Sequence, residues 1–378
     1  MVRRDCHIYL VPGFFGFNTI GSFDYFRGIS RLLRVALRRH GLEATIIECD
    51  PGPTAFIKYR AADLARQIEA AGGTRAKEIH LVGHSTGGLD VRQLLSPHTH
   101  GISAGLAGKI RKRARSAVLI STPHRGTRLA HFFMDIQGRA ALKMIAREAS
   151  TRGRIAIYAG AKLLDLVARA DDVLGNDDTT LDMLSRHLLG QLTLDPKDPF
   201  WAFLRRIAAD QGAMVQLTTE WMDHFNATVM DHPKVRYSSI VTAAPPPLGR
   251  GIFDLARRRP HLLSLGYSLL HTIVAWMPSP PAASLPVDDA LLVELRKKLP
   301  VDINMRTNDG IVPTLSQPYG KILGAELADH LDIIGQFERP KTSSYHDWLP
   351  SGSRFNEEAF TRVWRTVAEE IAVSSKLR

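Results

Sequence analysis

The chain has 378 residues, of which 44% are hydrophobic and 23% are charged. These values are typical of a globular protein with a large core and exclude an intrinsically disordered chain. The formal net charge is +11. The basic residues are scattered and form no nucleic-acid-binding motif, so we expect solvated basic faces and no nucleic-acid partner. Peripheral contact with an anionic membrane or lipid surface is the alternative.

The two cysteines, Cys6 and Cys49, are too few for a disulfide framework and favour a reducing compartment. The apolar stretch at 8–11 ends at Pro12-Gly13, which is too short for a secretory signal. No apolar run approaches the roughly 20 residues of a membrane span. The sequence therefore predicts a cytoplasmic protein with no signal peptide and no transmembrane segment.

Strands and helices alternate over residues 1–127, which predicts a mostly parallel central sheet with helices on both faces. We therefore expect an α/β fold. Strands are expected at 7–11, 44–48, 79–82 and 117–120, with helices over 29–40, 57–68 and 86–94 between them.

The alternation stops after residue 127, and the following segment is helical and too long for a loop. We interpret it as a large helical cap inserted into the core. The apolar stretch 262–276, in a second insertion, either lines an acyl pocket or packs between cap and core. The predicted units are core 1–127, cap 128–213, core 214–247, helical insertion 248–295 and core 296–378, with later strands at 235–241, 301–305 and 331–334.

A nucleophile elbow is predicted where the strand at 79–82 runs into Gly83-His84-Ser85-Thr86-Gly87. In such an elbow the serine lies on a strained strand-to-helix turn, and small residues two positions away on each side allow the tight bend. Ser85 is therefore the candidate nucleophile. A chance match on a structural turn is the alternative, which the flanking strand and helix disfavour.

A serine nucleophile needs a base, and the base needs an orienting acid. With this elbow the order along the chain is Ser, then Asp or Glu, then His. Asp309 follows a predicted strand and precedes Gly310, so it is the candidate acid, although Asp before Gly is also common in plain turns. His330 is the candidate base, with His346 as second choice and a purely structural histidine as the alternative.

The tetrahedral intermediate of acyl transfer needs preorganised N–H donors. The backbone N–H groups of Thr86 and Phe14 are the predicted donors. We expect Phe15, Phe17 and His84 to contact substrate, since the aromatic rings would form an apolar wall suited to an acyl chain. An ordinary hydrophobic turn packed under the cap explains the phenylalanines equally well.

Taken together, these motifs resemble those of the bacterial true lipases of the α/β-hydrolase fold. The resemblance covers roughly the first 127 and the last 80 residues and implies Ser85 as nucleophile, Asp309 as acid and His330 as base, with Phe14 and Thr86 as oxyanion donors. The motifs that carry it are 11–17 (VPGFFGF), 83–88 (GHSTGG), 121–127 (STPHRGT), 308–313 (NDGIVP) and 330–332 (HLD).

The chain differs from this family at two points, and the resemblance also implies a metal site. The family usually has a histidine where this chain has Pro12, and many of its members are secreted. Some relatives hold a structural calcium through an aspartate two residues after the catalytic histidine and a glutamine four further on, a spacing that Asp332 and Gln336 match. Asp288 and Asp289 are candidate further ligands. No cofactor is required for the predicted chemistry.

The expected function is that of a serine carboxylic-ester hydrolase, similar to a lipase or esterase, acting through an acyl-enzyme on a hydrophobic ester beneath a helical lid. An acyltransferase would use the same three residues with an alcohol in place of water. A non-catalytic module that binds a lipid or a partner is the alternative from another class, although no member of the triad is missing.

Overall fold

The computed structural model describes most of the predicted core. The described residues are 6–13, 19–20, 23–52, 55–99, 101–134, 212–247, 262–281, 285–339, 347 and 349–376. Residues 135–211 of the predicted cap lie outside them, and the domain boundaries at 128 and 213 stay predictions.

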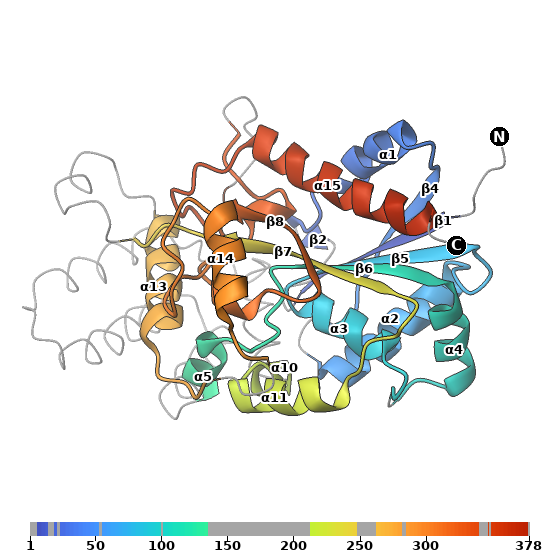
Figure 1. Ribbon diagram of the computed structural model, residues 1–378, viewed down its shortest axis with the longest axis horizontal. Coiled ribbons are helices and arrows are strands. Elements are labelled where there is room, and N and C mark those ends of the chain that lie inside the picture. The colour runs from blue at the N-terminus through green and yellow to red at the C-terminus, as the bar shows by residue number, and fades with distance from the viewer. Residues whose placement is uncertain are drawn as a thin grey trace, which may run out of the picture.

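Six strands form one parallel sheet in the order β4-β1-β5-β6-β7-β8 (Figure 1). Because parallel strands end at a common edge, the segments that follow them converge there. This carboxyl edge carries the candidate site. The strands are β1 (Cys6–Val11), β4 (Ala44–Glu48), β5 (Glu78–His84), β6 (Ala114–Ile120), β7 (Arg236–Ala243) and β8 (Lys321–Leu327), and a separate antiparallel pair consists of β2 (Thr19–Ile20) and β3 (Phe23–Asp24).

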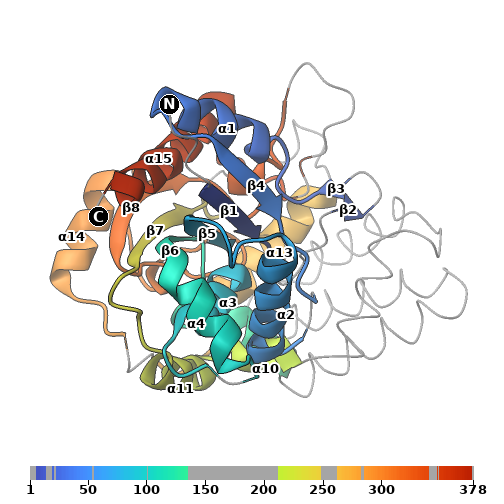
Figure 2. The ribbon, with the colours of Figure 1, turned by 90° about the vertical axis from the view of Figure 1, so that its right-hand side faces the viewer.

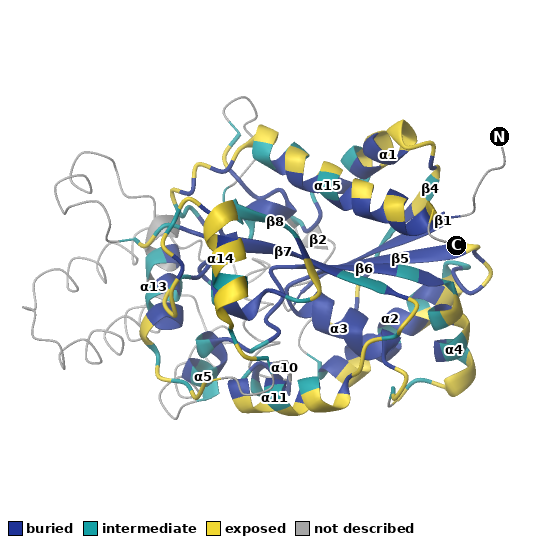
Figure 3. Ribbon diagram, viewed as in Figure 1, coloured by how far each residue is buried: buried dark blue, intermediate teal, exposed yellow. Residues whose placement is uncertain are grey.

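Helices cover both faces of the sheet, as Figure 2 shows from the end. On one face lie α1 (Ile29–Arg39) and α15 (Glu357–Lys376), and on the other lie α2 (Ile57–Ala70), α3 (Thr86–Leu95) and α4 (Ala104–Arg113). β1 and β5 are buried along their whole length, as expected for parallel strands covered on both sides (Figure 3). The predicted parallel sheet with helices on both faces is confirmed.

The remaining helices surround the carboxyl edge of the sheet. The apolar stretch at 262–276 forms a single helix, which packs against α5 through Ile273 and Val274 on one side and Leu129 and Phe132 on the other. The helices are α5 (Arg128–Met134), α10 (Gly212–Gln216), α11 (Thr219–Thr228), α13 (Leu262–Trp276) and α14 (Asp289–Lys298), with short 3-10 turns η2 (Thr314–Ser316) and η3 (Asp332–Ile334).

The prediction of a strand at 301–305 is wrong. Its alternating apolar and polar residues fit a strand, but polar side chains fold the backbone into a turn. Thr307 Oγ1 accepts a hydrogen bond from the backbone N–H of Asn304 at 3.0 Å, and Asn304 Oδ1 accepts one from that of Arg306 at 2.9 Å. Such local bonds compete directly with a sheet ladder.

The prediction of a strand at 331–334 is also wrong, because the Asp329 carboxylate accepts hydrogen bonds from the N–H groups of Leu331 and Asp332 and starts the turn η3. The last strand is β8 instead. It is an edge strand with Gly324 in its middle and mostly half-buried side chains, so its sequence carries a weak strand signal.

The two cysteines form no disulfide. Cys6 pairs in register with Ala44 at one end of the sheet, whereas the N–H of Cys49 bonds to the carbonyl of Leu10 near the other end. Among the described residues, no helix is long and apolar enough to cross a membrane.

Candidate active site

Ser85 lies at the turn between β5 and α3, with φ 55° and ψ −133°. Positive φ is strained for a residue with a side chain and persists only where surrounding structure enforces it. The neighbouring glycines make the turn possible. A Cβ at Gly83 would lie 2.5 Å from the N of Gly88, and one at Gly87 would lie 2.2 Å from the carbonyl oxygen of Val11. The elbow geometry predicted from the sequence is therefore present.

Asp309 and His330 form a hydrogen-bonded pair. His330 Nδ1 lies 2.8 Å from Asp309 Oδ2, and the two side chains are 2% and 0% exposed. An ionised carboxylate only accepts, so Nδ1 carries the proton and donates it. The lone pair of the neutral ring is then at Nε2. The pairing fixes which tautomer of His330 is present, as the proposed roles of the two residues require.

The Asp309 carboxylate is held by four further donors. Oδ1 accepts from the backbone N–H groups of Ile311 at 3.0 Å and Val312 at 2.7 Å. Oδ2 also accepts from the hydroxyl of Thr242 at 2.8 Å and from Gln317 Nε2 at 3.2 Å. The carboxylate is therefore fixed in position before any substrate binds.

The backbone of His330 is tied to the elbow. His84, which precedes Ser85, has Nε2 at 3.0 Å from the carbonyl oxygen of His330, and the two imidazole rings lie with centroids 4.7 Å apart. The backbone N–H of His330 bonds to the carbonyl of Asp309 at 2.9 Å. The structure thus brings Ser85, Asp309 and His330 to one edge of the sheet, although they come from separate parts of the chain.

The turn after β1 is held against the elbow from two sides. A Cβ at Gly13 would lie 2.5 Å from Ser85 Cβ, so the close approach requires glycine. The hydroxyl of Tyr25 accepts from the N–H of Gly13 at 2.7 Å, and the guanidinium of Arg60 donates to the carbonyl of Pro12 at 2.8 Å. Arg60 forms a buried ion pair with Asp90 at 2.7 Å, and burial raises the pKa of Asp90 to about 6.

Thr86 begins α3 and is 1% exposed. The first N–H groups of a helix have no acceptor within the helix, and the helix dipole makes this end favourable for negative charge. The Thr86 hydroxyl is also buried with no hydrogen-bond partner among the described residues. The N-terminus of α3, directly after Ser85, thus offers donors for an oxyanion.

Several predicted site residues lie outside the described residues: Phe14, Phe15, Phe17 and the alternative base His346. The substrate contact predicted for His84 conflicts with its position, because its side chain is fully buried and both ring nitrogens are bonded within the protein. We therefore withdraw that assignment.

Sequence reasoning missed Thr242, Gln317, Tyr25 and Arg60. Thr242 lies near the end of β7, and a polar residue near the carboxyl end of a buried strand is the one signal that could have marked it. No such signal marks the other three residues. Tyr25 bonds to a residue 12 positions away, Gln317 to one 8 positions away and Arg60 to one 30 positions away, and each pair meets only in the folded chain.

A second group of carboxylates lies next to the pair. Asp329, Asp332 and Asp347 each offer an oxygen within 4.8 Å of the others. Burial raises the pKa of all three, to about 7 for Asp332 and Asp347, and mutual repulsion adds to the shift. Ser351 and Ser353 donate hydroxyl hydrogen bonds to Asp329 and Asp332 at 2.8 and 2.7 Å. We call these three aspartates the acidic cluster.

The acidic cluster fits a hard divalent cation, which prefers several carboxylate and hydroxyl oxygens. Of the other residues considered for a calcium site, Asp288 and Asp289 do not fit. The side chain of Asp288 caps α14 by accepting from the N–H of Leu291, and Asp289 is exposed, so neither joins the cluster. Gln336 donates from Nε2 to the carbonyl of Asp24, and its Oε1 is buried with no hydrogen-bond partner among the described residues.

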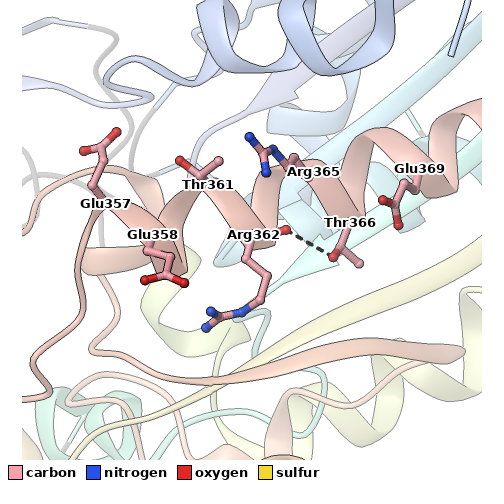
Figure 4. Close-up of a pocket in the computed structure, with 7 residues that line it drawn as sticks. All are labelled: Glu357, Glu358, Thr361, Arg362, Arg365, Thr366 and Glu369. Carbon is pink, nitrogen blue, oxygen red and sulfur yellow. Dashed lines mark hydrogen bonds between the residues drawn. The ribbon is translucent and has the colours of Figure 1, made fainter. Parts of the chain in front are cut away.

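A shallow groove elsewhere runs along the exposed face of α15 (Figure 4). Charged and hydroxyl side chains line it, and none of the candidate catalytic residues borders it. The lining residues are Glu357, Glu358, Thr361, Arg362, Arg365, Thr366 and Glu369.

Comparison with solved structures identifies the fold. The chain superposes on EstA from Clostridium botulinum with a TM-score of 0.50 and 19% identity, covering 97% of this chain and 87% of EstA. It superposes on lipase 1 from Pelosinus fermentans with a TM-score of 0.50 and 18% identity, covering 98% and 99%. The chain has the α/β-hydrolase fold.

Sequence comparison adds a partial match. A triacylglycerol lipase from Vibrio cholerae is 36% identical over 90 residues, which are 24% of this chain and 27% of that lipase. The chain thus matches about a quarter of the length of this curated relative. No protein-family model matches the chain. These results agree with the resemblance to bacterial lipases read from the motifs.

Proposed function

We propose that this α/β-hydrolase is a serine carboxylic-ester hydrolase with Ser85, His330 and Asp309 as its triad. The observation that carries the proposal is the convergence of a strained Ser85 elbow with the hydrogen-bonded Asp309–His330 pair, whose histidine backbone is bonded to the residue before the serine. An α/β-hydrolase fold and the partial likeness to a triacylglycerol lipase support it.

In the proposed mechanism, His330 Nε2 takes the proton of Ser85 Oγ as that oxygen attacks the ester carbonyl carbon. Asp309 keeps the proton on Nδ1 and stabilises the imidazolium that forms. The backbone N–H groups of Thr86 and Phe14 stabilise the oxyanion. His330 then protonates the departing alcohol, which leaves an acyl-enzyme on Ser85. Water, deprotonated by His330, releases the carboxylic acid and regenerates the serine.

A hydrophobic ester is the substrate class we propose. The named activity of the Vibrio relative is on triacylglycerols, and the motif at 13–17 of this chain places two further phenylalanines, Phe15 and Phe17, beside the predicted oxyanion donor Phe14. Contact with an anionic lipid surface remains an expectation from the net charge of +11.

The test is hydrolysis of a p-nitrophenyl ester series, from acetate to palmitate, by wild type and Ser85→Ala. Loss of the nucleophile should lower turnover on the order of 10⁶-fold. A fluorophosphonate should label wild type at Ser85 and leave the variant unlabelled. Equal rates for the two proteins, together with no label on Ser85, would disprove the serine mechanism.

Added acceptor alcohols distinguish hydrolysis from acyl transfer. We expect free acid as the main product, because nothing described in the structure favours an alcohol over water. Ester as the main product at millimolar acceptor would assign the same triad to an acyltransferase. An unreactive Ser85 in a folded protein that binds lipid would favour the binding module.

We further propose that the acidic cluster binds Ca²⁺ through Asp332, with Asp329 and Asp347 as the other carboxylate ligands. Two buried carboxylates, Asp329 and Asp332, and the half-buried Asp347 lie within 4.8 Å of one another and repel, and a divalent cation would offset that repulsion. The ion would have a structural role, because the proposed ester chemistry needs only the chain's own residues.

A further inference from the structure

A chain of three hydrogen bonds connects the turn after β1 to the backbone of His330. The Tyr25 hydroxyl bonds to the N–H of Gly13 at 2.7 Å and to His84 Nδ1 at 2.8 Å. His84 Nε2 bonds to the carbonyl oxygen of His330 at 3.0 Å. Tyr25 and His84 are 2% and 0% exposed, so no bulk water competes for these bonds. We call the set the Tyr25–His84 chain.

The directions of these bonds are determined by chemistry. Burial, reinforced by the repulsion of nearby His330, lowers the pKa of His84 well below its usual range, so the ring is neutral and carries one proton. The carbonyl of His330 only accepts, which puts that proton on Nε2. Nδ1 must then accept, so Tyr25 donates to it. The Tyr25 oxygen in turn accepts from the N–H of Gly13.

This ordering holds two groups of the candidate site. The first is Gly13, which is close enough to the elbow that a Cβ there would lie 2.9 Å from Ser85 Oγ. The second is the backbone of His330, which bonds to the residue before Ser85. With its N–H already bonded to Tyr25, Gly13 has no donor left for an oxyanion, so the loop must use a later N–H. This agrees with the predicted role of Phe14.

We propose that Tyr25 and His84 are positioning residues that set the distance between the turn after β1, Ser85 and His330 for catalysis. The inference rests on the proposed function. It assigns to His84 a role that does not involve substrate, and it gives Tyr25 a role in the rate of the reaction. Neither residue touches the reacting atoms.

The first test is Tyr25→Phe, which keeps the ring and removes only the hydroxyl. The change leaves the Gly13 N–H and His84 Nδ1 without partners in a buried site. We expect kcat per active site to fall about 10- to 100-fold with KM changed less than about threefold, because the lost interaction positions groups and does not bind substrate. Active sites are counted by fluorophosphonate titration, so misfolded protein does not enter the rate.

Tyr9→Phe is the matched control. Tyr9 is fully buried in β1, and its hydroxyl also bonds to a histidine, His7 Nδ1, at 3.1 Å, but it lies in the cluster packed under α2 and α3. It therefore loses a comparable buried hydroxyl without touching the Tyr25–His84 chain. We expect kcat per titrated site to stay within about twofold of wild type. An equal fall in both variants would overturn the positioning role, since it would reflect general destabilisation.

His84→Gln provides the second variant, because a glutamine amide can take the place of Nε2 and donate to the His330 carbonyl while losing the bond from Tyr25. In the double variant with Tyr25→Phe, we expect the loss in kcat to be smaller than the product of the two single losses, since both remove the same bond. If the loss in the double variant equals the product of the two single losses, Tyr25 and His84 do not act through one shared bond.

A readout that needs no substrate completes the test. In ¹⁵N NMR of histidine-labelled protein, His84 should appear as the Nε2–H tautomer, and Tyr25→Phe should shift its Nδ1 signal while leaving that of buried His80 in place. An Nδ1–H tautomer would overturn the assignment. Wild type that fails to label at Ser85 would disprove the proposed function and this inference together, whereas labelled wild type with unchanged Tyr25→Phe kinetics would disprove this inference alone.

Discussion

A single buried carboxylate, Asp309, and the acidic cluster lie close together at the carboxyl edge of the sheet, and their negative charges are compensated differently. Asp309 has a histidine partner. It also accepts hydrogen bonds from two backbone N–H groups and from the side chains of Thr242 and Gln317. In the acidic cluster, Asp329, Asp332 and Asp347 have each other as neighbours and hydroxyl or backbone donors, with no basic side chain bonded to them among the described residues.

The comparison shows how the surroundings decide what a buried carboxylate can do. Donors fixed around Asp309 keep it an acceptor for His330, which suits an orienting acid. In the acidic cluster, burial and like charge favour the protonated forms and raise the pKa values, so a proton or a cation is needed to relieve the repulsion. Four predictions, from the largest effect to the smallest, test this distinction.

The largest effect is expected from Asp309→Asn compared with Asp332→Asn, the same isosteric change at the two sites. Asp309→Asn should lower kcat on the order of 10⁴-fold, because the wrong tautomer of His330 becomes favoured. Asp332→Asn should lower kcat less than about tenfold, since the acidic cluster plays no part in the proposed chemistry. Ester hydrolysis by the two purified variants measures both.

Circular dichroism and fluorophosphonate titration control for folding in that pair. Similar losses of kcat in the two variants, with equal numbers of active sites labelled by the fluorophosphonate, would contradict the different roles given to Asp309 and the acidic cluster.

The second prediction concerns pH in the presence of a chelator. The pKa of Asp332 rises from 3.8 to about 7 in the folded state, so the folded protein binds the proton more tightly than the unfolded chain. Its stability contribution is therefore greatest at low pH and is lost as pH rises from about 4 to 7. The raised pKa therefore predicts a Tm that falls as the pH rises through this range.

Thermal unfolding at pH 5 and pH 8 in EDTA measures this dependence. Asp332→Asn should flatten it, because the amide has no proton to lose. A Tm that rises from pH 5 to pH 8 in both proteins would contradict the prediction. It would show that other groups dominate the pH dependence of stability and that charge repulsion in the acidic cluster does not destabilise the fold.

The third prediction is that Ca²⁺ stabilises the protein at pH 8. A site saturated at 100 times its Kd should contribute about 2.7 kcal/mol. The gain should shrink at pH 5, where protons compete for the carboxylates, and should vanish in Asp332→Asn. Differential scanning calorimetry with and without Ca²⁺ measures it, and an identical Tm in Ca²⁺ and EDTA at pH 8 would remove the calcium proposal.

The smallest effect is expected at the surface groove of Figure 4. Arg362 pairs with Glu326 at 2.7 Å, but its side chain is 56% exposed, so solvent screens the pair. Arg362→Ala should change the unfolding free energy by less than about 1 kcal/mol and leave ester hydrolysis unchanged. Urea unfolding checks the first value. A loss well above about 1 kcal/mol would mean that solvent screening does not explain the small effect expected here.

The sequence alone determined the elements whose signals are local. The strand, elbow and helix around Ser85 could be predicted because glycines at 83 and 87 leave one tight turn available, and the parallel sheet followed from alternating apolar periods. The chemical order Ser85, Asp309, His330 also came from the chain itself. The strands expected at 301–305 and 331–334 failed because side-chain hydrogen bonds of Asn304, Thr307 and Asp329 redirected the backbone.

Only the tertiary structure decided which groups surround the candidate triad. Thr242 and Tyr25 reach their partners across 67 and 59 residues of chain, and His84 reaches the carbonyl of His330 across 246. A hydrogen bond between such distant residues leaves no periodic trace in the sequence, because it depends on where the strands of the sheet end relative to one another. Burial, which lowers the pKa of His84 and raises that of Asp332, likewise exists only once those layers have packed.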